Sequence, residues 1–222
     1  MRYHYTSGSP FVSKIEIPGA AIAIKADQAG RITEESWNNG GRTVYAYGKD
    51  GPLASLESFD EHGQLVFGQR LARDNRGRTL RELRRYPNFQ ALYQYHYDPL
   101  DRLERVGRKE SNSDSEFRRY TYDERGNRLE EYRDGLLYAS YRYDASNRLV
   151  EICDGQGNTT PCEYDRNGNL IRKGSHLFEY DATQRLRRVM STLEAGPVVS
   201  YQYAATDERA LITRPNEVER SF

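Results

Sequence analysis

The sequence predicts an all-β protein, an array of antiparallel β-hairpins that form one large sheet. Three observations predict it. The 222 residues include 18 tyrosines, many at alternate positions. An aspartate often follows such a pair, and a glycine or asparagine often stands three residues after the aspartate. No segment keeps the i, i+3, i+4, i+7 apolar spacing of a helix for a full helix length.

Pairs of tyrosines separated by one residue mark the predicted strands. Side chains alternate between the two faces of a strand, so both rings point to one face and the residue between them to the other. That residue is mostly polar, as at His96, Arg142 and Glu163. Tyrosine also has a high strand propensity. The pairs, two with one substitution, are Tyr3/Tyr5, Tyr45/Tyr47, Tyr95/Tyr97, Tyr120/Tyr122, Tyr141/Tyr143, Cys162/Tyr164, Phe178/Tyr180 and Tyr201/Tyr203.

An aspartate closes many of these strands and starts a turn. Its carboxylate is expected to accept backbone N–H groups of the turn. The residue three positions later is expected to need a positive φ, which glycine and asparagine tolerate. These turn positions hold Gly63, Gly77, Asp101, Gly126, Asn147, Gly168 and Gln184.

The repeat length fits two short strands and two turns. Asp123, Asp144 and Asp165 are 21 residues apart (144 − 123 and 165 − 144), and a strand usually has about 5–6 residues. Turns at 134–135, 155–158 and 174–175 mark the other ends of the hairpins.

The repeat residues are predicted to be structural rather than catalytic. They are Tyr95, Tyr97, Asp98, Tyr120, Tyr122, Asp123, Gly126, Tyr141, Tyr143, Asp144, Tyr164, Asp165, Gly168, Tyr180 and Asp181.

Three segments are expected along the chain. The repeats of tyrosine pair, aspartate and turn occupy residues 26–203. Residues 1–25 and 204–222 lose the pattern, since Tyr203 is followed by Ala204 and not by aspartate. We interpret both ends as boundary or capping segments of the array.

Composition excludes several classes of function. Lys+Arg and Asp+Glu are both 33, so the chain lacks the basic excess of a nucleic-acid-binding surface. No run of 18 apolar residues occurs, so no membrane span is expected. Met1–Tyr5 has no apolar signal core, so synthesis in the cytoplasm is expected, with export by a signal-peptide-independent system left open.

No catalytic, cofactor or metal site is predicted. Repeated aspartates are spaced by the repeat and do not form a close acid–base pair. Asp165–Asn169 resembles a calcium loop but lacks its ligand order and closing glutamate. The four histidines show no metal-ligand spacing. The tyrosine rows suit either glycan stacking or cross-strand packing, and we favour packing.

Two cysteines remain, Cys153 and Cys162, on either side of a predicted hairpin tip. They could face one another across it and form a disulfide after export. In a reducing cytoplasm two free thiols are expected instead.

Two segments carry a resemblance to a known family. Tyr120–Leu129 (YTYDERGNRL) and Tyr141–Leu149 (YRYDASNRL) resemble the YD repeat of the Rhs family. That family includes bacterial Rhs polymorphic toxins, the C component of Tc toxins, and teneurins. The resemblance extends from about Ala26 to Tyr203.

The resemblance implies a curved or spiralling sheet that forms part of a shell-like structure. In the bacterial toxins such a shell encloses a toxin domain. This chain looks shorter than a complete shell, and it lacks the Asp-Pro-x-Gly-x-x-Asp signature linked to self-cleavage. Asp98–Asp101 begins with Asp-Pro but has no glycine at that place, so we interpret it as one more repeat turn.

The expected function is therefore a non-enzymatic scaffold, a shell segment that encloses or shields a toxin or joins another chain. Two alternatives remain: a free-standing glycan- or protein-binding module that uses the tyrosine face, and an immunity-like partner of a toxin. The expected partners are a toxin domain, the rest of a shell or a second copy, with a glycan as a further candidate. No cofactor, no nucleic acid and no membrane span are expected.

Overall fold

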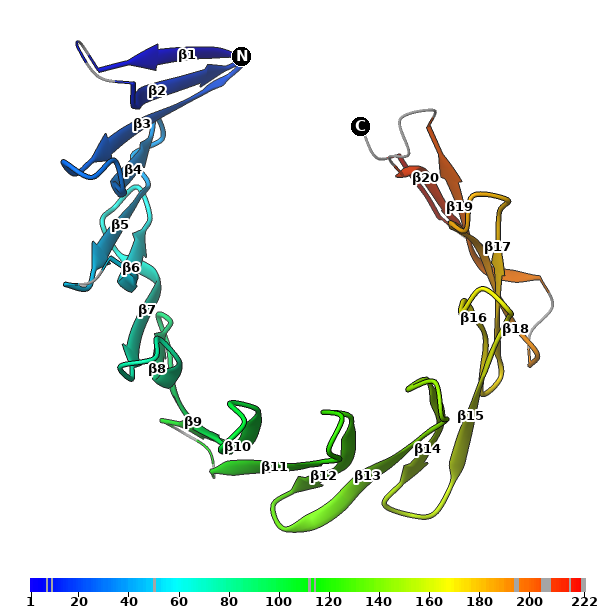
Figure 1. Cartoon of the computed structure of the whole chain (residues 1–222). Coiled ribbons are helices and arrows are strands. Elements are labelled where there is room, and N and C mark those ends of the chain that lie inside the picture. The colour runs from blue at the N-terminus through cyan, green and yellow to red at the C-terminus, as the bar shows by residue number, and fades with distance from the viewer. Residues whose placement is uncertain are drawn as a thin grey trace. The chain divides into compact units, whose positions relative to one another are not determined.

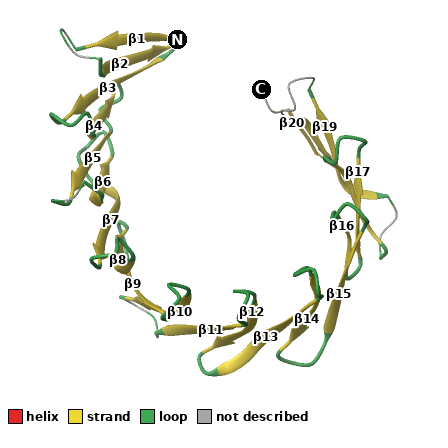
Figure 2. Ribbon diagram, in the orientation of Figure 1, coloured by secondary structure: helices red, strands yellow, loops and turns green. Residues whose placement is uncertain are grey.

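The structure, a computed structural model, describes residues 1–6, 8, 10–49, 51–111, 113, 115–193, 196–204, 209–215 and 217–220. These residues form strands joined by short turns (Figure 1), and none of them is helical (Figure 2). The all-β fold class is therefore confirmed. The described part of the chain contains no helix that is long and apolar enough to cross a membrane.

The chain divides into two compact units, each described by itself. The first unit comprises Met1–Arg119 with Arg133–Gly135, and the second comprises Tyr120–Tyr132 with Leu136–Phe222. Strands β11 (Glu116–Tyr122) and β12 (Arg128–Arg133) contribute residues to both.

The first unit holds ten further strands in chain order. They are β1 (Arg2–Tyr5), β2 (Val12–Ile17), β3 (Ala20–Ala26), β4 (Ile32–Trp37), β5 (Arg42–Tyr47), β6 (Leu53–Phe59), β7 (Leu65–Arg73), β8 (Thr79–Arg85), β9 (Gln90–Tyr97) and β10 (Leu103–Glu110).

The second unit holds nine further strands. They are β13 (Leu136–Tyr143), β14 (Leu149–Asp154), β15 (Thr159–Tyr164), β16 (Leu170–Lys173), β17 (His176–Tyr180), β18 (Leu186–Ser191), β19 (Pro197–Tyr203), β20 (Arg209–Arg214) and β21 (Glu217–Arg220).

Each strand pairs with the next one along the chain, antiparallel. This order runs from β1 to β10 in the first unit and from β13 to β21 in the second. Residues 1–25 and 204–222 therefore contain strands that continue the same order, namely β1–β3 and β20–β21.

A β-bulge recurs where a strand ends in the second tyrosine of its pair. Arg142 pairs with Glu151, but the next residue, Tyr143, pairs with Leu149, which leaves Val150 as the extra residue. The same shift occurs before Tyr47, Tyr164, Tyr180 and Tyr203. Bulges bend a strand and increase its twist, so the twist recurs with the repeat.

The hydrophobic core is thin. Among the described residues, the buried apolar or aromatic side chains are Ala91, Tyr120, Ala139, Cys162 and Val189, and no large side chain is fully buried. The tyrosines of the pairs are mostly half-buried, and the residues between them, such as His96 and Arg142, are exposed. The packing therefore depends on rows of neighbouring tyrosine and arginine side chains on one face.

Cys153 and Cys162, which could have faced one another across the hairpin, do not do so. The register pairs Cys153 with Thr159 and Cys162 with Lys173. Thr159 and Cys162 are three residues apart on one strand, so the two cysteines lie on opposite faces of the sheet. Both are free thiols, and burial raises the pKa of the Cys162 thiol.

Gly168 tests the turn conformation without a steric complication. Its φ is 86°, and nothing lies within 4 Å of a Cβ built on it. A β-branched valine is strained at positive φ, whereas asparagine adopts the left-handed conformation more readily. We expect Gly168→Val to lower the free energy of unfolding by about 1–2 kcal/mol more than Gly168→Asn, measured by urea denaturation. Equal losses for the two variants would contradict this turn geometry.

Candidate functional site

The turn that follows each repeat aspartate has one geometry throughout. In the turn 144–148, Asp144 Oδ1 accepts the backbone N–H groups of Ser146 and Arg148, both at 2.9 Å. Asp144 N–H also donates to the Arg148 carbonyl, and Asn147 N–H to the Asp144 carbonyl. One carboxylate oxygen thus satisfies two turn donors. The same pattern occurs in the turns that begin at Asp27, Asp60, Asp74, Asp98, Asp123, Asp154, Asp165 and Asp181.

All seven positions expected to need a positive φ have one. The four glycines have φ between 77° and 88°, and Asp101, Asn147 and Gln184 have 62°, 64° and 66°. A left-handed conformation costs a non-glycine residue about 1–2 kcal/mol. Each of these three side chains accepts a hydrogen bond from a neighbouring turn: Asp101 from Arg78, Asn147 from Asn127 at 2.9 Å, and Gln184 from Asn169. That contact offsets the strain and links successive turns.

The second carboxylate oxygen binds the side chain four residues later. Asp144 Oδ2 accepts Arg148 Nε at 2.8 Å and pairs with Arg148 Nη2 at 2.7 Å. Asp165 Oδ2 accepts Asn169 Nδ2 at 2.8 Å. The residue after the turn is therefore arginine or asparagine for a structural reason.

The same arginine covers a tyrosine ring on the neighbouring strand. The Arg148 guanidinium lies 5.3 Å from the centroid of Tyr164, and Arg78 lies 4.9 Å from that of Tyr97. Cation–π contacts at exposed sites contribute about 0.5–1 kcal/mol each. The aspartate, the arginine and the tyrosine thus form one chain of contacts in the repeats of Asp74 and Asp144.

The hydroxyl of the second tyrosine binds a carbonyl beside the bulge. Tyr164 donates to the Leu149 carbonyl at 3.0 Å, and Leu149 is the residue that pairs opposite Tyr143 at the bulge. A bulge disrupts the backbone hydrogen-bond ladder locally. The Leu149 carbonyl therefore needs another donor, and the Tyr164 hydroxyl supplies it. The equivalent bonds join Tyr47 to Ile32, Tyr97 to Thr79, Tyr180 to Leu170 and Tyr203 to Leu186.

The first tyrosine of three pairs binds a glutamate instead. Tyr45 donates to Glu35 at 2.7 Å, Tyr95 to Glu82 at 2.8 Å and Tyr141 to Glu131 at 3.4 Å. Burial and the Glu35 carboxylate raise the pKa of Tyr45 to about 12. Burial raises the pKa of Glu82, but hydrogen bonds from Arg84, Gln69 and Tyr95 outweigh it and hold that pKa below its usual range.

The predicted repeat residues are distributed along both units and do not converge on one place. Each tyrosine pair lies beside its own turn, and the hydroxyls, carboxylates and ring faces contact other groups of the repeat. Tyr120, for example, is buried under Arg128, whose guanidinium lies 4.3 Å from the ring centroid. Tyr122 and Tyr143 end β11 and β13 directly before the turns of Asp123 and Asp144. This arrangement can hold a sheet together, but it presents no shared reaction centre.

The described part of the chain contains no cluster of three or more His, Cys, Asp or Glu side chains that could hold a metal ion. His96 is exposed between Tyr95 and Tyr97. His62 lies in the turn of Asp60, beside Glu61 at 3.9 Å.

Sequence reasoning missed two turn aspartates and three buried or half-buried glutamates. Asp27 follows alanine rather than an aromatic residue, and Asp154 begins a turn at the opposite ends of the hairpins. Their shared signal is Asp followed four residues later by Arg or Asn, whatever precedes it. Glu35, Glu82 and Glu131 had no sequence signal, because their tyrosine partners are set by strand register.

The turn carboxylates predict sensitivity to acid. Hydrogen bonds from Arg148 hold the pKa of Asp144 below its ordinary value of 3.8. A lowered folded-state pKa contributes stability that is fully present above the unfolded value and is lost as pH falls through the folded one. We expect Asp144→Asn to be less stable than the unchanged protein near neutral pH, with the difference shrinking as pH falls below about 4. Urea denaturation across that range measures it. Glu124→Gln, at an exposed position of the neighbouring turn, is the matched control. A difference that stays constant with pH would refute the role of the Asp144 charge.

Comparisons with a family model, with a curated protein and with solved structures agree on one family. The family model described as teneurin YD-shell matches residues 57–220. The tRNA3(Ser)-specific nuclease WapA of Bacillus spizizenii is 27% identical over 199 residues, which cover 88% of this chain and 8% of the nuclease.

Solved structures show the same fold. The chain matches the Photorhabdus luminescens Tc holotoxin pore with a TM-score of 0.57, at 16% identity over 87% of this chain and 13% of that chain. It matches a TcdB2–TccC3 crystal structure with a TM-score of 0.58, at 16% identity over 90% of this chain and 14% of that one. The chain thus spans less than a sixth of the length of each of these relatives. The resemblance to the Rhs/YD-repeat family is confirmed, and because the family model covers most of its length, the chain belongs to the teneurin YD-shell family.

Proposed function

We propose that this chain is a non-catalytic wall segment of a YD shell, which shields a toxin polypeptide or associates with another chain to do so. The observation that carries the proposal is that the polar and aromatic side chains of the repeat bind one another and the adjacent strands. Tyrosine hydroxyls bind backbone carbonyls of the adjacent strand, and turn arginines bind turn aspartates and neighbouring rings. Such contacts stabilise a sheet with a thin core, which suits a wall better than a catalytic domain.

The relatives support the same role. Their chains are several times longer than the matched region, and the solved ones are parts of Tc toxins. We propose that this array likewise works together with further strands, from a longer shell or from a second copy. Unpaired strand backbone invites such pairing. We also propose synthesis in the cytoplasm.

The tyrosine face is a poor candidate for glycan binding. Several ring faces already lie under arginine guanidinium groups, as at Tyr97 and Tyr164. The hydroxyls of the same tyrosines donate to backbone carbonyls. A sugar would have to displace both contacts, so the geometry favours the scaffold over this alternative.

Shielding can be tested with the polypeptide encoded by the adjacent gene. We expect the full chain, co-expressed with that polypeptide, to purify with it and to slow its digestion by a nonspecific protease. A mixture in which the two separate on size exclusion, and in which digestion proceeds at the rate of the polypeptide alone, would overturn the proposal. Light scattering of the chain by itself is the accompanying measurement of self-association.

Catalysis can be tested separately with tRNA, the substrate that the name of the nuclease relative gives. We expect no cleavage when the chain is incubated with total tRNA and magnesium, since no acid–base pair or metal cluster appears among the described residues. Gel analysis of the tRNA gives the readout, with a known ribonuclease as positive control. Cleavage that persists through purification and disappears on heat denaturation would show that the chain is an enzyme.

A further inference from the structure

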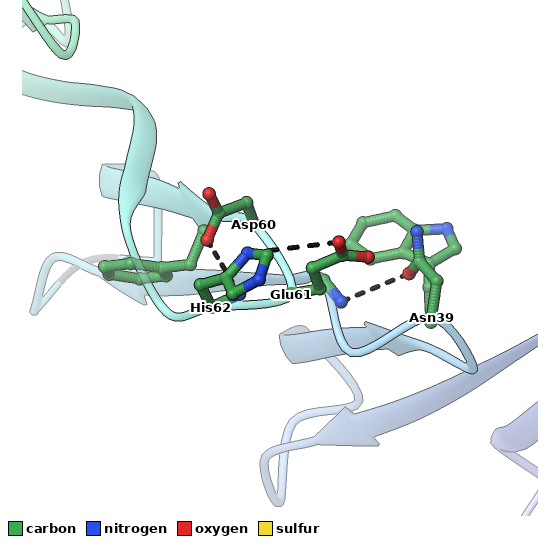
Figure 3. A pocket seen from close by; sticks show the side chains of 7 residues that line it. Asn39, Asp60, Glu61 and His62 are labelled. Atoms are coloured by element: carbon green, nitrogen blue, oxygen red, sulfur yellow. Dashed lines mark hydrogen bonds and ion pairs between the residues drawn. The ribbon is translucent and has the colours of Figure 1, made fainter.

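A hollow of about 600 Å³ lies between two turns of the first unit (Figure 3). The turn 37–41 joins β4 to β5, and the turn 60–64 joins β6 to β7, so both lie at the same end of their strands. The hollow is open to solvent and lies apart from the tyrosine rows. Its lining side chains are Trp37, Asn39, Phe59, Asp60, Glu61 and His62.

The turn 37–41 keeps the repeat backbone but replaces the aspartate. Trp37 N–H donates to the Gly41 carbonyl at 2.8 Å, and Gly40 N–H donates to the Trp37 carbonyl at 3.0 Å. These are the two backbone bonds of every aspartate turn, so Trp37 occupies the aspartate position. Asn39 Oδ1 accepts Gly41 N–H at 3.1 Å and thereby takes over part of the missing carboxylate's role. The turn thus places an indole ring where the repeat has a carboxylate.

The turn 60–64 keeps the aspartate but leaves one oxygen open. Asp60 Oδ1 accepts His62 N–H at 2.9 Å and Gln64 N–H at 2.8 Å. In the eight other aspartate turns of the described residues, Oδ2 accepts a side-chain donor from the residue four positions later. Here that residue is Gln64, and among the described residues no side chain binds Asp60 Oδ2. The carboxylate oxygen left open belongs to a residue that lines the hollow.

The two altered turns are in contact. A Cβ on Gly40, whose φ is 91°, would lie 3.3 Å from Glu61 Cα. A Cβ on the buried Gly41 would lie 3.5 Å from the Phe59 carbonyl and 3.9 Å from Trp37 Cε3. Glycine therefore permits the close approach that brings Trp37 and Asp60 to one hollow. Two departures from the repeat meet at this place, and a third, Gly48 in the aspartate position of the turn 48–52, lies outside the hollow. Functional sites are where departures from a local rule are expected.

Charged groups lie in and beside the hollow. Asp60 and Glu61 contribute carboxylates, but the Arg42 guanidinium lies 5.0 Å from the centroid of Phe59, and the His62 ring lies 3.9 Å from Glu61. On the other side of the turn 60–64 a second hollow of about 520 Å³ is lined by aromatic and amide side chains, including Tyr86, Phe89 and Gln90.

We propose that the hollow of Trp37 and Asp60 binds a ring of a neutral oligosaccharide. A sugar ring has an apolar C–H face, which can pack on the indole, and a rim of hydroxyls. Asp60 Oδ2 accepts from those hydroxyls, and Asn39 Nδ2 donates to them. A longer oligosaccharide extends across the turn 60–64 towards Tyr86 and Phe89. This site is separate from the shell role and does not depend on it.

Trp37 is the single tryptophan of the chain, so its fluorescence reports on the hollow directly. The experiment is a titration of the full chain with cellohexaose, chitohexaose and maltohexaose, followed by tryptophan fluorescence. We expect a saturable change with at least one of the three. Poly-lysine is the competing probe, because a cationic partner would also suit aromatic rings and carboxylates.

Matched variants identify the site. Asp60→Asn keeps the Oδ1 acceptor that the turn needs but removes the open carboxylate, and we expect it to weaken sugar binding about ten-fold or more. Asp74→Asn makes the same change in a regular turn and is expected to leave binding unchanged. A Glu61→Gln variant checks the neighbouring carboxylate if Asp60→Asn is poorly folded, and we expect it to weaken binding too. Three outcomes would each overturn the proposal: no response to any of the sugars, a response to poly-lysine alone, or equal loss in Asp60→Asn and Asp74→Asn.

Discussion

The carboxylate of the turn aspartate is the contact on which each repeat depends. One oxygen satisfies two backbone donors of the turn, and the other fixes the side chain four residues later. Four of these side chains, Arg31, Arg78, Arg148 and Arg185, also cover a tyrosine ring of the next strand. A single residue type thereby determines the turn, the direction of the return strand and part of the packing on the tyrosine face. These hydrogen bonds join residues at most four positions apart in the sequence.

Many small contacts replace a large hydrophobic core in this protein. A hydrogen bond contributes about 0.5–1.5 kcal/mol net, and an exposed cation–π contact about 0.5–1 kcal/mol. Neither is large compared with full burial of a leucine or phenylalanine, at about 1.5–3 kcal/mol. The same contacts recur in repeat after repeat, however, so their contributions accumulate along the chain. Repeated contacts of this kind stabilise each unit without a large core.

Departures from the repeat are as informative as the repeat. Asp101, Asn147 and Gln184 replace glycine at positive φ, and each accepts a hydrogen bond from a neighbouring turn. These departures have a structural explanation within the array. Trp37 in the aspartate position and the open oxygen of Asp60 have none, and both line the same hollow. The regularity of the eight other aspartate turns is what makes the open oxygen of Asp60 visible.

The sequence by itself determined the strands, the turns and the family of this protein. The reason is that the tyrosine alternation and the aspartate turn are local: residues two to four positions apart determine the face of a strand and the conformation of a turn. Gly126, Asn147 and Gly168 could therefore be identified as positive-φ positions from the spacing alone.

Only the tertiary structure decided which residues meet across strands. The partner of Tyr164 is the Leu149 carbonyl, the partner of Tyr95 is Glu82, and Cys153 and Cys162 lie on opposite faces. Each of these depends on register, and the bulge shifts register by one residue in each repeat. A shift of one residue reverses the face of every side chain that follows, so spacing in the sequence cannot give these contacts. The hollow of Trp37 and Asp60 arises in the same way, because it joins two turns that only the pairing of β4 with β5 and of β5 with β6 brings together.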